Sequence, residues 1–183
     1  MQAHDLDPAG HPYDALTPDV VLDALDATGL RGDGRLQALN SYENRVYLAR
    51  LEDSGSVVLK FYRPGRWSEE QIEEEHDFAL ELATAELPMV APLQLQGSTL
   101  HRHAGFFYSV SPARGGRRPE LDDPEVLEWI GRLLARLHQV GAARQFKFRP
   151  VLDAETFGSE PLQWLLGQDT IPLEAASRWR EAA

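Results

Sequence analysis

The segment Val57-Val58-Leu59-Lys60-Phe61-Tyr62 decides how the rest of the sequence is interpreted. Its β-branched and aromatic residues predict a strand, which Pro64-Gly65 ends. Lys60 is the one charged residue in this otherwise apolar strand. If both faces of the strand are covered, the ammonium of Lys60 cannot simply be solvated, and burying a charge without a partner costs several kcal/mol. We therefore expect a partner of opposite charge.

The partner is predicted on the helix that follows the strand. Ser68 and Gln71 have the spacing of a capping box, so the helix starts there and extends to about Ala85. Successive residues of a helix are rotated by about 100°, which places Glu75 inside an apolar arc. That arc consists of Ile72, Phe78, Ala79 and Leu82, and the opposite, solvated side holds Glu70, Glu73 and Glu74. The sequence thus predicts an ion pair between Lys60 and Glu75.

Further strands are predicted on both sides of this unit. They cover residues 36–39, 45–51, 93–96 and 106–110, and an earlier helix begins at Thr17-Pro18 and ends at Gly29. The expected order is helix, three strands, helix, two strands. This order predicts the α+β class, with a five-stranded antiparallel sheet that carries one inserted helix.

The segment Pro112-Ala113-Arg114-Gly115-Gly116 separates this region from a helical one. A helix with a broad apolar stripe is expected from Asp123-Pro124 to Gly141, and weaker helical stretches are expected at 162–166 and from residue 172 onward. We therefore predict a loose arm over 1–14, one domain over 15–112 and a second, incomplete one over 113–183.

Composition excludes several classes of protein. The chain has 183 residues, with 29 acidic and 18 basic ones, so its net charge of −11 argues against a nucleic-acid partner. No apolar run approaches ~18 residues, so we expect no membrane association. Zero cysteines exclude disulfides and cysteine nucleophiles. Together with the lack of a secretory leader at the N-terminus, they lead us to expect a cytoplasmic protein.

Three motifs resemble a known family: residues 39–47 (Leu-Asn-Ser-Tyr-Glu-Asn-Arg-Val-Tyr), residues 58–64 (Val-Leu-Lys-Phe-Tyr-Arg-Pro), and Glu74-Glu75-His76 followed by Phe78-Ala79-Leu80. They resemble the stress response kinase A family, bacterial serine/threonine protein kinases with the aminoglycoside phosphotransferase and choline kinase type of fold. The resemblance covers most of residues 15–150 and is weak beyond. It implies a kinase-like N-lobe over 15–112 and the first helices of an incomplete α-helical C-lobe over 113–183.

The resemblance assigns roles to individual residues. Lys60 would hold the α- and β-phosphates of ATP, and Glu75 would orient Lys60. The loop from Asn40 to Asn44 would stand where protein kinases have a glycine-rich loop. Because it contains no glycine, the side chains of Ser41 and Asn44 would donate hydrogen bonds in place of successive backbone amides.

The resemblance also implies how adenine would be held. The segment from Val110 to Ala113 would be the hinge beside the base. The carbonyl of Ser111 and the amide of Ala113 would bind the edge of the base. Pro112 has no N–H and cannot supply that donor.

Mg²⁺ and a protein hydroxyl complete the implied reaction, but the sequence provides no ligands for the metal. Its only asparagines are Asn40 and Asn44, so nothing after Gly116 matches a His-x-Asp-x-x-x-x-Asn catalytic loop. Asp153 and Asp169 lack the surroundings of metal ligands. We therefore predict no metal site here and an inactive chain, as either a partial product or a natural short form of a kinase.

Two other functions remain open. The first is a small-molecule phosphotransferase that acts on an aminoglycoside, a sugar or a choline-like alcohol, because the fold is shared. The second is a non-catalytic module that binds a nucleotide or a partner through the sheet and hinge.

Overall fold

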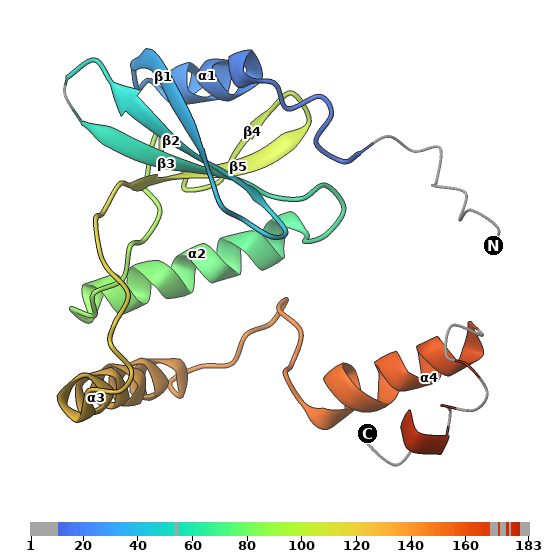
Figure 1. The fold of residues 1–183 in the computed structure, drawn as a ribbon. Coiled ribbons are helices and arrows are strands. Elements are labelled where there is room, and N and C mark those ends of the chain that lie inside the picture. The colour runs from blue at the N-terminus through green and yellow to red at the C-terminus, as the bar shows by residue number, and fades with distance from the viewer. Residues whose placement is uncertain (1–10, 54, 169–171, 173–174, 176, 180–183) are drawn as a thin grey trace. The chain divides into compact units, whose positions relative to one another are not determined.

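The structure is a computed structural model that describes residues 11–53, 55–168, 172, 175 and 177–179 (Figure 1). The chain forms two compact units that divide between Gln145 and Phe146. The first unit contains the strands β1 (Gly32–Leu39), β2 (Arg45–Leu51), β3 (Ser56–Phe61), β4 (His101–His103) and β5 (Phe106–Pro112). Its helices are α1 (Pro18–Ala27), α2 (Glu69–Thr84) and α3 (Pro124–Gly141). The second unit contains the short π-helix η1 (Glu155–Ser159) and α4 (Glu160–Gly167).

The five strands form one antiparallel sheet in the order β1-β2-β3-β5-β4, with α2 inserted in the chain between β3 and β4. In the centre of the sheet Lys60 lies opposite Val46 of β2 and Ser109 of β5. The predicted α+β class with a five-stranded antiparallel sheet and one inserted helix is therefore confirmed.

The fourth strand lies elsewhere than the sequence predicted, because residues 93–96 do not form one. This segment makes a single bridge, between Leu95 and Ser98, and the amide of Leu93 donates to the carbonyl of Val110. The fourth strand is His101–His103. It pairs with β5 through the two-residue turn Ala104-Gly105, where both residues have positive φ as a tight hairpin turn requires. That pairing gives hydrogen-bond partners to the backbone groups along the outer edge of β5.

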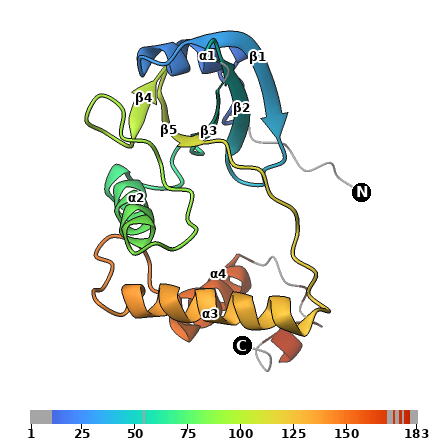
Figure 2. The ribbon, with the colours of Figure 1, turned by 90° about the vertical axis from the view of Figure 1, so that its left-hand side faces the viewer.

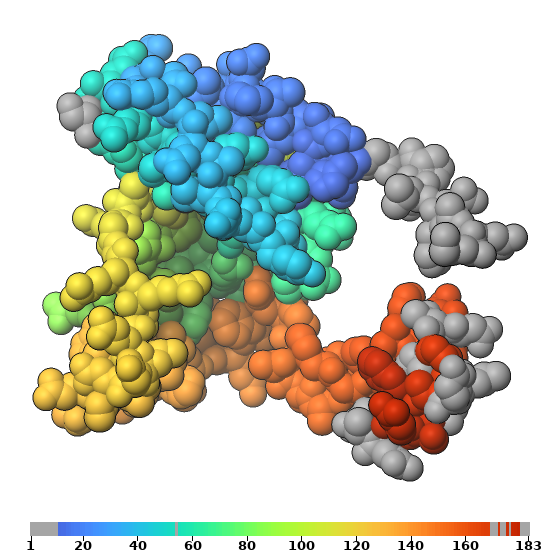
Figure 3. Space-filling view, viewed as in Figure 1, coloured from blue at the N-terminus to red at the C-terminus, as the bar shows by residue number. Residues whose placement is uncertain are grey.

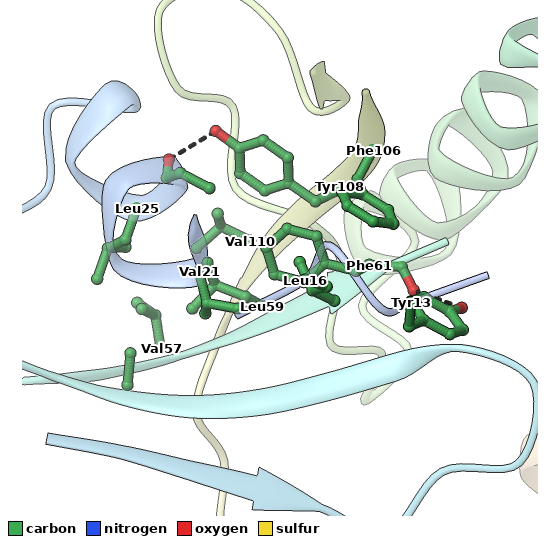
Figure 4. Close-up of a cluster of buried hydrophobic side chains, with 12 residues drawn as sticks. Tyr13, Leu16, Val21, Leu25, Val57, Leu59, Phe61, Phe106, Tyr108 and Val110 are labelled. Carbon is green, nitrogen blue, oxygen red and sulfur yellow. Dashed lines mark hydrogen bonds between the residues drawn. The ribbon is translucent and has the colours of Figure 1, made fainter. Parts of the chain in front are cut away.

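The two faces of the sheet have different neighbours, since α1 covers one face and α2 the other (Figures 1 and 2). Val57, Leu59 and Phe61 alternate along β3 and are buried in the main core, which α1 completes. Figure 4 shows this core, with the hydroxyl of Tyr108 directed at α1. Lys60 therefore points away from the core and toward α2.

Side chains cap the three long helices where the sequence predicted their starts. The Thr17 hydroxyl accepts a hydrogen bond from the amide of Val20, and both bonds of the capping box between Ser68 and Gln71 are present. The Asp123 carboxylate accepts from the amide of Glu125 at the start of α3. Local capping thus sets the boundaries of these helices.

Helix α3 follows a long extended segment that runs along the outside of the molecule from the sheet (Figure 3). The apolar stripe predicted on α3 is present, but none of its side chains is fully buried. Leu127 and Leu134 are each 49% exposed. The described part of the chain therefore covers only a fraction of this stripe.

The second unit matches part of the helical prediction. Helix α4 contains the stretch 162–166, and residues 175 and 177–179 are helical, whereas the rest of the stretch from residue 172 lies largely outside the described residues. The domain boundary predicted after residue 112 differs from the division after Gln145 and stays a prediction. Among the described residues, no helix is long and apolar enough to span a membrane.

Candidate functional site

Lys60 and Glu75 form the ion pair that the sequence predicted. Nζ of Lys60 lies 2.9 Å from Oε1 of Glu75, which joins the C-terminal end of β3 to the second turn of α2. The Lys60 side chain is 32% exposed and that of Glu75 is 39% exposed, so the pair lies at the rim of a cavity and not in the closed core. The ion pair is confirmed, and the roles of its two residues in phosphate binding stay predictions.

Tyr62 is a second neighbour of the Lys60 ammonium. Nζ lies 4.6 Å from the centre of the Tyr62 ring, within the range of a cation–π contact. Burial alone would lower the pKa of Lys60, but the interactions with Tyr62 and with the Glu75 carboxylate outweigh it and raise that pKa. The site therefore favours a protonated, positively charged Lys60.

A buried network of polar side chains lies behind the ion pair. Oη of Tyr62 lies 2.7 Å from Nε2 of His76 and 3.4 Å from Oγ of Ser109. The other ring nitrogen of His76, Nδ1, lies 3.0 Å from Oγ1 of Thr99. Burial lowers the pKa of His76 to about 4, so its ring is neutral at pH 7. This network joins β3, α2, β5 and the loop before β4.

A cavity of about 270 Å³ opens beside these residues. Its polar lining consists of Lys60, Tyr62, Glu75, His76, Ser109 and Ser111. Apolar side chains from α2, from the connector after it and from α3 complete it, among them Phe78, Met89 and Leu137. A cation at the rim of a largely apolar cavity suits a ligand that combines an anionic group with an apolar ring.

The loop residues Ser41 and Asn44 bind each other and the neighbouring backbone. The Ser41 hydroxyl donates to the carbonyl of Asn44 at 2.7 Å, and Oδ1 of Asn44 accepts from the amide of Arg63 at 3.3 Å. Neither residue lines the cavity around Lys60. These contacts order the turn between β1 and β2, and a role in binding phosphate stays a prediction.

The hinge residues Ser111 and Ala113 differ in their surroundings. Ser111 lines the cavity and pairs with Val58 in the sheet. The amide of Ala113 donates to the carbonyl of Ser56 at 3.2 Å, because β5 continues its pairing with β3 to this point. That amide is therefore engaged in the sheet, and it would have to leave Ser56 to bind a base.

The described residues show no preformed cluster of metal ligands. They contain no group of three or more His, Asp or Glu side chains that could hold a metal ion. Asp153 is exposed, and its Oδ1 accepts from the amide of Thr156 at 2.9 Å, which lowers the pKa of Asp153. Asp169 lies outside the described residues.

Sequence reasoning missed His76, although a usable signal was present. On the same helical projection His76 falls about 40° from Ile72, next to the edge of the apolar arc. A histidine at that edge needs partners for two ring nitrogens if it is covered, and Tyr62 and Thr99 provide them. The prediction for Glu74 was wrong, because this side chain is buried and not solvated.

The sequence of this chain is similar to those of known bacterial kinases. The chain is 48% identical over 151 residues to Stress response kinase A of Salmonella choleraesuis and to Serine/threonine protein kinase RdoA of Salmonella typhimurium. It is 44% identical over 160 residues to Stress response kinase A of Escherichia coli K12. These matches cover 82–87% of this chain and 46–49% of the relatives, so the chain spans about half the length of the curated relatives it matches.

Solved structures show the same fold. An amicoumacin kinase in complex with AMP-PNP and Ca²⁺ matches 89% of this chain and 51% of its own, with a TM-score of 0.69 and 22% identity. A spectinomycin phosphotransferase matches 81% of this chain and 46% of its own, with a TM-score of 0.58 and 12% identity. The kinase-like fold implied by the sequence is thereby confirmed. The family model described as "Phosphotransferase enzyme family" matches residues 35–183, and the chain belongs to this family.

Proposed function

We propose that this chain is the nucleotide-binding part of an ATP-dependent serine/threonine protein kinase of the stress response type. In its complete form the enzyme would transfer the γ-phosphate of ATP to a protein hydroxyl. The observation that carries the proposal is the Lys60–Glu75 pair at the rim of a cavity, in a chain 48% identical to a relative named as a serine/threonine protein kinase.

Each site residue has one task in this proposal. Lys60 binds the α- and β-phosphates, and Glu75 keeps the Lys60 ammonium directed at them. Ser111 and Ala113 bind the adenine edge through their backbone, for which the amide of Ala113 exchanges its bond to Ser56. Ser41 and Asn44 donate to the phosphates from the β1–β2 turn. These residues position a nucleotide, and none of them accepts a proton from the hydroxyl that is phosphorylated.

The proposed enzyme works in the cytoplasm on a protein substrate, with no nucleic-acid or membrane partner. When bound, Mg²⁺ neutralises the charge that develops between the phosphates. Because nothing after Gly116 matches a His-x-Asp-x-x-x-x-Asn catalytic loop, we propose that the ligands of Mg²⁺ are absent from this chain and that the chain alone does not transfer phosphate.

Phosphorylation of a small molecule is the second candidate. It is favoured by the structural neighbours, which include an amicoumacin kinase, an aminopropanol kinase and a spectinomycin phosphotransferase. The N-terminal unit would bind ATP in the same way in both cases. The difference lies in the acceptor, which the residues around Lys60 do not select.

The nucleotide-binding role of this chain is tested in a transfer assay with labelled γ-phosphate. The samples are the 183-residue chain, the same chain continued with the C-terminal half of Escherichia coli Stress response kinase A, and that chimera with Lys60→Ala. We expect background transfer from the chain, clear transfer to a generic protein substrate from the chimera, and a loss of several orders of magnitude in the variant. Equal activity with and without Lys60 would contradict the proposal.

A further inference from the structure

The polar network behind Lys60 is closed to solvent, unlike the ion pair itself. His76 is 1% exposed, and Tyr62 and Ser109 are each 3% exposed. A buried polar side chain is costly unless its hydrogen-bonding groups are satisfied, so the bonds of Tyr62 and His76 are strongly constrained. Tyr62 is the one member of the network whose ring also contacts the Lys60 ammonium.

Both partners of His76 are hydroxyls, which can donate or accept, so each tautomer of the ring leads to a different arrangement of protons. A neutral imidazole has one N–H donor and one acceptor nitrogen. If Nδ1 carries the proton, it donates to the hydroxyl oxygen of Thr99, and Nε2 accepts from the hydroxyl of Tyr62. The oxygen of Tyr62 then keeps its lone pairs for donors on the Lys60 side. The opposite tautomer would direct an N–H at this oxygen and use one of those lone pairs.

We infer that Tyr62 is a positioning residue for Lys60, and that His76 in its neutral, Nδ1-protonated form holds the Tyr62 hydroxyl in place. Lys60 then has two oriented neighbours, the carboxylate of Glu75 and the phenol of Tyr62. The importance of this arrangement rests on the proposed function, in which the direction of the ammonium decides how phosphates bind.

The arrangement also explains how a flexible side chain is directed. A lysine has four rotatable bonds, and fixing it in one conformation costs side-chain entropy. Glu75 and His76 are consecutive on α2, so one helix presents one neighbour of Lys60 and anchors the other. A displacement of α2 would therefore release both contacts together.

Nuclear magnetic resonance of the 183-residue chain tests the inference without a nucleotide. Nitrogen shifts of His76 report its tautomer, and a titration of the Lys60 side chain reports its pKa. We expect the Nδ1–H tautomer in the wild type. Tyr62→Phe, which keeps the ring and removes the hydroxyl, should lower the Lys60 pKa and speed exchange of its ammonium protons roughly tenfold, because the ammonium loses its polar interaction with the phenol oxygen.

The matched control is Tyr108→Phe. Tyr108 is also a buried tyrosine, and its hydroxyl donates to the carbonyl of Ala24 at 2.6 Å on the α1 side of the sheet. This variant loses a buried hydrogen bond of the same kind and should leave Lys60 unchanged. Equal effects of the two substitutions on Lys60 would reduce Tyr62 to a structural role and overturn the inference.

A second pair of variants tests the part assigned to His76. In His76→Gln the side-chain oxygen can accept a hydrogen bond from Tyr62. In His76→Leu the side chain has no acceptor. We expect His76→Gln to preserve the Lys60 pKa and His76→Leu to lower it. An Nε2–H tautomer in the wild type, or the same Lys60 pKa in both variants, would also overturn the inference. Because no nucleotide is involved, these results stand apart from success or failure of the transfer assay.

Discussion

Arg136 of α3 binds the backbone of Ala85, the residue that caps the C-terminus of α2. Its Nη2 donates to the carbonyl of Ala85 at 2.9 Å and to that of Glu86 at 3.1 Å. The last carbonyls of a helix lack partners within the helix and carry partial negative charge, so a guanidinium there is favourable. Arg144 of α3 adds an ion pair of 3.1 Å with Glu81. Helix α3 thus holds the helix that carries Glu75.

The first prediction concerns Arg136. Arg136→Ala should lower the free energy of unfolding by about 1 kcal/mol, because two carbonyls lose a charged donor at an exposed position. Urea unfolding provides the measurement. Arg132→Ala is the matched control on the same helix, since Arg132 pairs with Glu128 one turn away on the surface and should contribute within about 0.5 kcal/mol. A larger loss from Arg132→Ala would contradict this view of α3.

The second prediction concerns acid stability. The pKa of His76 is about 4 in the folded chain and about 6.5 in the unfolded one, so the unfolded chain binds the proton first as the pH falls. Above about pH 6.5 the ionisation of His76 therefore does not change the free energy of unfolding. As the pH falls to about 4, it lowers the free energy of unfolding by about 3 kcal/mol. The groups that face His76 are Tyr62, Thr99, Glu75, Asp77, Lys60 and His101, and burial outweighs the attraction of the carboxylates.

Urea unfolding between about pH 7 and about pH 4 measures this loss. His76→Gln, which cannot take up a proton, should flatten the dependence by most of that amount. The matched control is the same substitution at the exposed His138 of α3. Parallel curves for the wild type and His76→Gln would show that other groups cause the acid sensitivity.

A third prediction concerns the main core. Tyr108→Phe should lower the free energy of unfolding by about 1–3 kcal/mol, because the buried carbonyl of Ala24 loses its donor. Burial raises the pKa of Tyr108 to about 12, so the hydroxyl stays protonated and donates throughout the accessible pH range. The control is Tyr42→Phe, since Tyr42 is fully exposed. A similar loss in both variants would exclude the bond to Ala24 as the cause.

The fourth prediction concerns nucleotide affinity. Titration calorimetry of the 183-residue chain with ATP and Mg²⁺ should detect weak binding or none, because hinge hydrogen bonds contribute only about 0.5–1.5 kcal/mol each and the sequence after Gly116 has no catalytic loop to hold the metal. Any heat that is measured should disappear in Lys60→Ala. Micromolar affinity would mean that metal ligands exist among residues assigned no such role.

The predictions from sequence succeeded where the deciding interactions are local, or where a charged residue stands in an otherwise apolar segment. Thr17, Ser68 and Asp123 cap helices through bonds to residues two or three positions away, and such bonds depend on spacing alone. Lys60 and Glu75 each place a charge in an apolar pattern, and pairing with each other offsets the cost of burying either charge alone. Their contact was therefore predictable across fifteen residues of chain.

The predictions failed where the outcome depends on which segment covers a surface. A helical projection placed Glu74 opposite Ile72 but could not show that this side is also covered, and Glu74 is buried. The fourth strand formed at His101–His103 because the turn at Ala104-Gly105 aligns it with β5, whereas residues 93–96 had only the apolar pattern of a strand.

By itself, the sequence determined the order of the elements, the starts of the long helices, the family and the pairing of Lys60 with Glu75. The order, the helix starts and the ion pair follow from spacing, capping and charge within short stretches of chain, and the family follows from the resemblance of three motifs. Only the tertiary structure decided that Tyr62, His76, Ser109 and Thr99 meet behind Lys60, and that the amide of Ala113 is occupied by Ser56. Four separate segments supply that network, and a pattern along one segment carries no information about the partners that another brings to it.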